Sequence, residues 1–141
     1  MYLCKDLQQV AEKRIIFWVK KMQAYPALGC LYQGPWIVDV IIVGSRRMQT
    51  LNRTWRNKDQ PTDVLSFPSA FGILGSLAIC NTVLVRQAKH HTVRQELDVL
   101  LVHGILHLLG FDHELGFKEA RVMRGWEQKL VGEGLIGRFV E

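Results

Sequence analysis

Apolar residues recur three or four positions apart over about residues 6 to 23, which predicts an amphipathic helix. The buried stripe of this helix would consist of Leu7, Ala11, Ile15, Val19 and Met22. One proline and two glycines between residues 26 and 34 then predict a loop rather than a continuation of the helix.

Three shorter stretches have the composition of β-strands. Residues 36–43 form a nearly continuous apolar run rich in β-branched side chains, which predicts a strand buried on both faces. A polar turn over residues 57–61 precedes a second predicted strand at 62–67, which Pro68 ends. A third strand is predicted at 76–80, after a loop that contains Gly72 and Gly75.

The remaining segments between these strands, and after them, predict further helices. Ser45 is expected to cap a helix that has Met48, Leu51 and Trp55 on its inner face. Residues 81–91 predict another helix, of about ten residues.

The most apolar helix is predicted over residues 93–109. Thr92 and Gln95 have the spacing of a capping box at its start, and Gly110 is a natural terminator at its end. A last amphipathic helix ends at Gly132, and its apolar positions are Phe117, Ala120, Met123, Trp126 and Leu130.

Short strands among several helices predict an α+β fold, with a single small mixed β-sheet packed with four to five helices. The 141 residues fit one domain that spans residues 1–141. A chain of this length can bury a core without disulfides or metal ions. A bound metal would therefore serve function rather than folding.

The charge of the chain favours a polyanionic partner. Lys and Arg number 18 against 13 Asp and Glu, which gives a net charge of +5 and favours nucleic acid before membrane. No segment is apolar for long enough to span a bilayer, and the N-terminal region has no secretory signal. Three widely spaced cysteines indicate free thiols in a reducing compartment, so we expect a cytoplasmic protein.

Three of the five histidines fall within eleven residues, at His103, His107 and His113. Four helical residues turn the chain by about 400°, so His103 and His107 lie on one face, one turn apart. Gly110 permits the chain to reverse, so that His113 can reach the same point as a third ligand. Three protein nitrogens leave one tetrahedral position open, as in catalytic zinc sites, so the spacing predicts one zinc ion.

The alternative is that these histidines belong to an ordinary core, as a lone histidine on an apolar helix usually does. Burying two imidazoles without partners in a helix of Leu, Val and Ile would cost about 1–3 kcal/mol each, which favours metal ligation. The spacing also matches the metzincin peptidases, H-E-x-x-H-x-x-G-x-x-H. The residue after the first histidine is Gly104, however, which cannot act as the general base and argues against peptide hydrolysis.

Residues 103–113, which read H-G-I-L-H-L-L-G-F-D-H, resemble the signature of the YbeY endoribonuclease family. A second stretch, L-N-R-T-W-R-N-K-D at 51–59 followed by T-D-V-L-S-F-P at 62–68, is similar to the other hallmark of that family. A third is L-G-S-L-A-I-C at 74–80, followed by Gln87 and Ala88. The resemblance runs from about residue 38 to residue 134.

The resemblance implies a zincin-like fold and a zinc-dependent hydrolase of phosphodiester bonds, with the three histidines as metal ligands. It implies an endoribonuclease specific for single-stranded RNA, acting in ribosomal RNA maturation (16S-type 3′ end) and in ribosome quality control. The implied partners are ribosomal RNA and ribosomal proteins or ribosome assembly factors. Arg56 falls on the arginine that the family uses as a catalytic or RNA-contacting group.

Other polar residues near these motifs are candidates for supporting roles. Arg56 would hold a phosphate through its planar fork, and Arg53 and Lys58 would follow the RNA backbone. Asp112 would either accept a hydrogen bond from a ligand imidazole or satisfy turn backbone groups. Asp63 and Ser66 would either line the substrate groove or serve the strand and its cap. Trp55 is expected in the core rather than as a base-stacking platform.

The chain departs from the family pattern in two places. Ser76 stands where the family usually has Asp, and the loop between Pro68 and Leu74 is short. Two other functions remain open on the sequence alone. One is a ribosome- or RNA-binding module with a mainly structural metal, and the other is a different zinc hydrolase, such as a peptidase.

Overall fold

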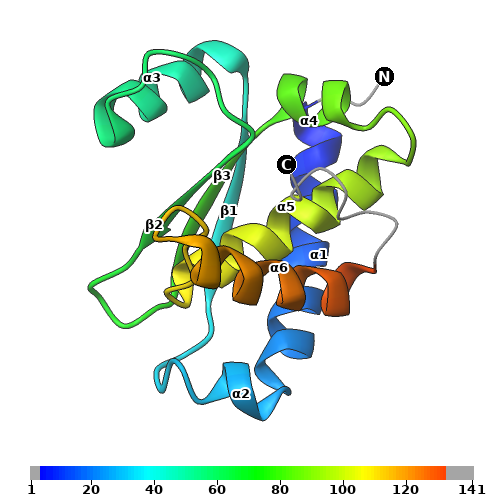
Figure 1. The fold of residues 1–141 in the computed structure, drawn as a ribbon. Coiled ribbons are helices and arrows are strands. Elements are labelled where there is room, and N and C mark those ends of the chain that lie inside the picture. The colour runs from blue at the N-terminus through cyan, green and yellow to red at the C-terminus, as the bar shows by residue number, and fades with distance from the viewer. Residues whose placement is uncertain (1–3, 133–141) are drawn as a thin grey trace.

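The sheet and the helices of the chain form an α+β fold in the computed structural model, which describes residues 4–132 (Figure 1). The rest of the predicted 1–141 domain lies outside the described residues. The elements are α1 (Cys4–Gln23), α2 (Pro26–Gly29), β1 (Val38–Val43), α3 (Ser45–Arg56), β2 (Val64–Pro68), β3 (Gly75–Cys80), α4 (Asn81–Gln87), α5 (Val93–Leu108) and α6 (Phe117–Val131). The predicted fold class is confirmed, with six helices in the described part.

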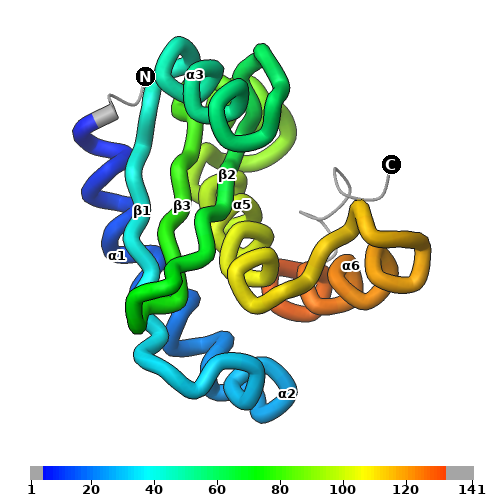
Figure 2. The backbone as a smooth tube through the Cα atoms, turned by 90° about the vertical axis from the view of Figure 1, so that its left-hand side faces the viewer, coloured from blue at the N-terminus to red at the C-terminus, as the bar shows by residue number. Residues whose placement is uncertain are grey.

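The three strands form one mixed sheet in the order β1-β3-β2. β1 runs parallel to β3, and β2 runs antiparallel to it. α1 and α5 pack on one face of the sheet, where the larger apolar cluster lies, and α3 packs on the other face over a smaller one. Figure 2 shows the strands side by side, with α1 and α5 behind them and α3 at one end.

α5 is the central helix of the larger cluster, and its sequence explains how it begins and ends. The Thr92 side chain accepts a hydrogen bond from the Gln95 backbone N–H, and the Gln95 side chain accepts one from the Thr92 N–H. The predicted capping box is therefore confirmed. After Leu109, Gly110 adopts a φ of 103°, which lets the chain turn back toward the helix.

Gly104 lies in the middle of α5 because the helix passes very close to β3. A Cβ atom at this position would lie 2.7 Å from Leu77 Cδ2 and 2.9 Å from Leu77 Cδ1. Leu77 is itself fully buried, so its side chain has little room to move. The cost of a mid-helix glycine, about 1 kcal/mol against alanine, is thus offset by close packing of helix and sheet.

Several predicted details are wrong. β1 is not buried on both faces, since Ile41 is 40% exposed on the face where α3 packs mainly over β3. The N-cap of α3 is Gly44 rather than Ser45, and α4 ends at Gln87 instead of reaching residue 91. Residues 26–29 form a short helix within the predicted loop. Among residues 4–132, no helix has both the length and the apolar character needed to cross a membrane.

Candidate metal centre

The three histidines predicted as metal ligands come together at the end of α5. His103 and His107 lie on successive turns of the helix, and His113 lies in the loop after Gly110. The Nε2 atoms of His103 and His107 are 3.1 Å apart. His113 completes the set, since its ring centroid lies 5.4 Å from each of the other two. One potential ligand atom from each residue lies within 4.8 Å of the others.

This arrangement fits a tetrahedral zinc ion. Zinc–nitrogen bonds of about 2.0–2.1 Å place two ligand nitrogens about 3.4 Å apart, close to the separation of the His103 and His107 Nε2 atoms. All three candidate ligands are imidazole nitrogens, which suit zinc. Three nitrogens leave one coordination position for water or substrate, which is typical of catalytic zinc.

Burial and charge keep His107 in the form that binds metal. Burial is the largest cause that lowers the pKa of His107, to about 4, and the neighbouring His103 and His113 lower it further. The imidazole is therefore neutral near pH 7 and has a nitrogen lone pair available. Protons would compete weakly for this ligand at physiological pH.

Glu127 is a part of the site that the sequence analysis missed. Its Oε1 atom lies 3.1 Å from His103 Nδ1, so the imidazole N–H donates to the carboxylate. The bond directs His103 Nε2 toward His107 and fixes the tautomer, as carboxylates do for zinc-binding histidines. Glu127 is 2% exposed. Its position between Met123 and Leu130, on the buried stripe of α6, was the available signal.

The histidines line a groove of about 460 Å³, together with the end of α3, the turn that follows it, and β2. The candidate residues that line it, apart from the histidines, are Arg56, Lys58, Asp63, Ser66 and Asp112. Arg53 is not among the lining residues, and its guanidinium pairs with Asp59 at 3.3 Å. The groove therefore collects residues from two of the three sequence stretches that resemble one family, residues 103–113 and 51–68.

Arg56 lines the same groove as the three histidines. Its Nη2 atom lies 3.5 Å from Glu114 Oε2, and both side chains are about half exposed. Its charge is close enough to be among the causes that lower the pKa of His107. An exposed pair of this kind contributes at most about 1 kcal/mol. The guanidinium can therefore leave Glu114 for a phosphate at little cost.

The other candidates make local hydrogen bonds. Asp112 Oδ1 accepts from the Glu114 N–H at 2.9 Å, which is the turn role that the sequence allowed. Asp63 Oδ1 accepts from the Val64 N–H at 2.8 Å, at the start of β2. Ser66 Oγ donates to the Gly104 carbonyl at 3.2 Å and so ties β2 to α5 between the two helical ligands.

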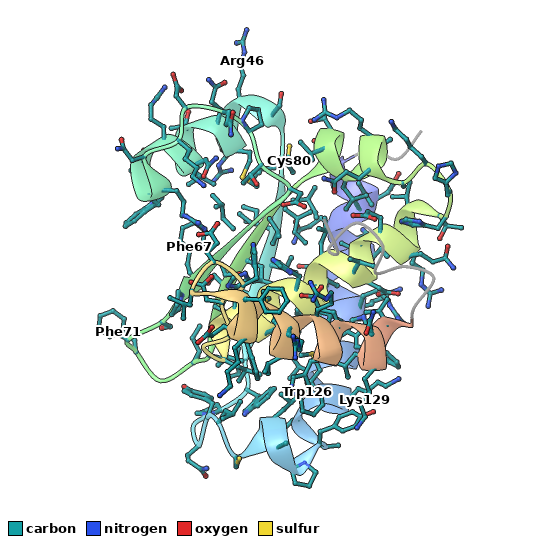
Figure 3. The ribbon with its side chains drawn as sticks, in the orientation of Figure 1. Arg46, Phe67, Phe71, Cys80, Trp126 and Lys129 are labelled. Carbon is teal, nitrogen blue, oxygen red and sulfur yellow. The ribbon has the colours of Figure 1, made fainter. Side chains whose placement is uncertain are left out.

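Ser76, the residue that departs from the family pattern, lies outside the groove. It is on β3, and its register partners are Asp39 on β1 and Phe67 on β2. The short loop between β2 and β3 ends the sheet far from α3 and places Phe71 at its tip, as Figure 3 shows. Neither Ser76 nor any residue between Pro68 and Leu74 lines the groove.

Comparison with known proteins places this site in context. The sequence model of one family, described as Endoribonuclease YbeY, matches residues 3–133 of the chain. A protein of that name from Thermodesulfovibrio yellowstonii is 46% identical over an alignment of 103 residues, and the match covers 67% of this chain and 65% of the relative. One from Anaeromyxobacter dehalogenans is 46% identical over 108 residues, covering 71% of this chain and 55% of the relative.

These two alignments span less than two thirds of each relative. The protein of the same name from Solibacter usitatus is 45% identical over an alignment of 104 residues, and the match covers 71% of this chain and 71% of the relative. A solution structure of a protein from Thermotoga maritima is 29% identical and has a TM-score of 0.57. That similarity covers 99% of the present chain and 87% of the Thermotoga protein.

Proposed function

Because the chain belongs to the YbeY family of endoribonucleases, we propose that it is a zinc-dependent endoribonuclease that hydrolyses single-stranded RNA. The observation that carries the proposal is the convergence of His103, His107 and His113 in a groove that Arg56 faces. The net charge of +5 is consistent with a polyanionic substrate. The RNA would be ribosomal, so the protein would act in the cytoplasm in rRNA maturation (16S-type 3′ end) and ribosome quality control, with ribosomal proteins or assembly factors as partners.

The proposal gives the bound metal and four side chains in or beside the groove a role each. When bound, a zinc ion would supply Lewis acidity, both to polarise a phosphoryl oxygen and to make water a nucleophile at neutral pH. Arg56 would hold the scissile phosphate by two charge-assisted hydrogen bonds. Lys58, and Arg53 beyond the groove, would attract the RNA backbone. Glu127 would keep His103 oriented toward the ion.

A peptidase function is disfavoured by the packing around Gly104. Zinc peptidases of the H-E-x-x-H type have their general base at this position. The space that a side chain would need is filled by Leu77, with its Cδ2 atom 2.7 Å from the place of a Cβ. The chain therefore has neither the base nor room for it, which leaves phosphodiester hydrolysis as the better match to the metal site.

The proposed function is tested by incubating the protein with a single-stranded ribosomal RNA fragment, with the same fragment in a duplex, and with casein. We expect cleavage of the single strand, little cleavage of the duplex and none of casein. Treatment with a chelator should stop the cleavage, and added zinc should restore it. A protein that binds the single strand but cuts it neither before nor after zinc addition would contradict the proposal and favour a binding module.

Replacing Arg56 with alanine is expected to lower kcat by about 10²- to 10³-fold, the cost of removing one donor that stabilises transition-state charge. Arg56→Lys should recover only part of this, because an ammonium cannot make the bidentate contact. Arg86→Ala, at an exposed arginine of α4, is the matched control. Steady-state cleavage of a fluorescently labelled single strand measures the effect. Equal kcat values for Arg56→Ala and Arg86→Ala would remove Arg56 from the mechanism.

Replacing Glu127 with glutamine is expected to weaken zinc binding by about 10- to 100-fold, as loss of an outer carboxylate partner does. Glutamine keeps the size of the side chain but removes the negative charge that favours the His103 N–H. Competition with a chromophoric chelator measures the affinity. Glu119→Gln, at an exposed position of the same helix, is the control. Unchanged zinc affinity in Glu127→Gln would show that Glu127 acts only as a packing residue and not through its charge.

A further inference from the structure

Trp55 is exposed at the end of α3, contrary to the prediction that it belongs to the core. The side chain is 66% exposed, whereas Trp18 and Trp36 are 4% and 7% exposed. The helical spacing of Met48, Leu51 and Trp55 is real, but only the first two lie in or against the apolar cluster under α3. Figure 1 shows the carboxyl end of α3 projecting beyond the strands. Because the indole contributes little to the core in this position, its exposed surface is available to contact a ligand.

One aromatic contact among the described residues orients the indole. Its ring contacts Phe67 of β2 edge to face, with the centroids 6.0 Å apart and the planes at 77°. Phe67, labelled in Figure 3, lies below α3 and is itself packed against the smaller apolar cluster. The contact restricts the orientation of Trp55 while most of its surface stays open to solvent. A flat, pre-oriented aromatic surface of this kind loses little entropy when it binds another ring.

The aromatic pair borders the groove that contains the metal ligands. Trp55 directly precedes Arg56, which lines the groove. Phe67 follows the lining residue Ser66, and its side chain lies on the opposite face of β2, toward α3. β2 is the outer strand of the sheet, so no other strand among the described residues covers this side. A chain that leaves the groove over the outer side of β2 would pass Trp55.

The charges near Trp55 favour nucleic acid over protein at this place. Arg53, Arg56 and Lys58 all lie within three residues of it, and all three are exposed. Asp59 and Glu114 pair with the two arginines only as exposed ion pairs, which contribute little and are readily exchanged for phosphate. Proteins that bind single strands without strong sequence preference combine such cations with aromatic rings on which bases stack.

We propose that Trp55 is a stacking platform for one base of the RNA single strand, next to the phosphate that Arg56 holds. This inference rests on the proposed function, because it describes where the single-stranded RNA substrate runs beside the groove. The platform explains a preference for single strands, since a base in a duplex has both faces covered by its neighbours. Trp55 would thus set substrate affinity and strand selectivity, while the metal ligands and Arg56 perform the hydrolysis.

The test compares wild type, Trp55→Ala, Trp55→Phe and the control Phe71→Ala, which removes an exposed aromatic ring outside the groove. Stopped-flow fluorescence with a short oligouridine records binding before cleavage, and steady-state assays give KM and kcat. We expect the oligouridine to quench tryptophan fluorescence in wild type but not in Trp55→Ala. The affinity of Trp55→Ala for the oligouridine should be weaker by about 5- to 100-fold, because one base–aromatic stack is lost. KM should rise accordingly while kcat stays close to wild type.

Three further measurements separate stacking from a structural role and from charge. Trp55→Phe should retain most of the affinity, and an oligonucleotide made abasic should bind wild type and Trp55→Ala equally. The salt dependence of binding should be the same in wild type and Trp55→Ala, because no phosphate contact is lost, whereas Lys58→Ala should reduce it.

The outcomes distinguish this inference from the function on which it rests. If wild type binds the oligouridine and Trp55→Ala binds it equally well, the platform is refuted while the nuclease proposal stands. A protein partner for this surface would then be the better explanation. If wild type neither binds nor cuts any single strand, the proposed function itself is refuted and the platform falls with it.

Discussion

His107→Ala is expected to remove the metal from the protein and to abolish RNA cleavage while leaving the fold intact. His107 is the second histidine of the triad along the chain, and its Nε2 atom lies 3.1 Å from that of His103. Two imidazoles alone hold zinc far more weakly than three. The loss of zinc affinity should therefore exceed the 10- to 100-fold weakening that follows removal of a carboxylate partner of a ligand histidine. The helix should survive, because alanine is a good helix former and His107 is only partly buried.

Elemental analysis of the purified variant, a cleavage assay and a thermal melt followed by circular dichroism together measure this result. His90→Ala, at an exposed histidine outside the groove, is the matched control and should keep both metal and activity. A His107→Ala protein that retains one metal ion per chain would place the metal elsewhere. One that is metal-free yet cuts at the wild-type rate would show that the triad is not the catalytic centre.

Gly104→Glu is expected to destabilise the protein by about 3 kcal/mol or more rather than to create a peptidase. The substitution completes the H-E-x-x-H pattern in the sequence, but the new Cβ would meet the buried Leu77 side chain at 2.7 Å. Overpacking of a core costs about 1–3 kcal/mol, and a carboxyl group forced among apolar side chains adds a desolvation cost. Urea denaturation measures the change.

Two further substitutions separate the crowding from the charge. Gly104→Ala should gain about 1 kcal/mol in helix propensity and lose a comparable or larger amount to Leu77. Gly125→Ala, at a helical glycine of α6 with no atom within 4 Å of its Cβ position, should be stabilised. If Gly104→Glu unfolded at the same urea concentration as wild type, the close packing of α5 on β3 would not be the reason for the glycine.

The sequence predicts the centre of the site well because its geometry is local. His103 and His107 are placed by the pitch of one helix, and Thr92, Gln95 and Gly110 determine where that helix begins and ends. These features depend on residues within a few positions of each other. The resemblance to the YbeY family then points to residues 51–68, several of which line the groove. No helical or strand periodicity relates these residues to the histidines.

The features that the sequence does not predict depend on contacts between distant segments. Glu127 reaches His103 from 24 residues away, and its role follows only from the packing of α6 on α5. Trp55 has the spacing of a core residue, but α3 extends past the apolar cluster that its first turns cover. The exposure of Ile41 likewise depends on where α3 packs, which is mainly over β3 rather than β1.

The central claim is that one metal ion held by the three histidines is required for RNA cleavage. The most direct test is to remove metal from the wild-type protein with a chelator and to titrate zinc back while measuring bound metal and single-strand cleavage in the same samples. The account predicts that cleavage is absent without metal, rises in proportion to bound zinc and reaches its plateau at one ion per chain. Cleavage at full rate by the metal-free protein would contradict it.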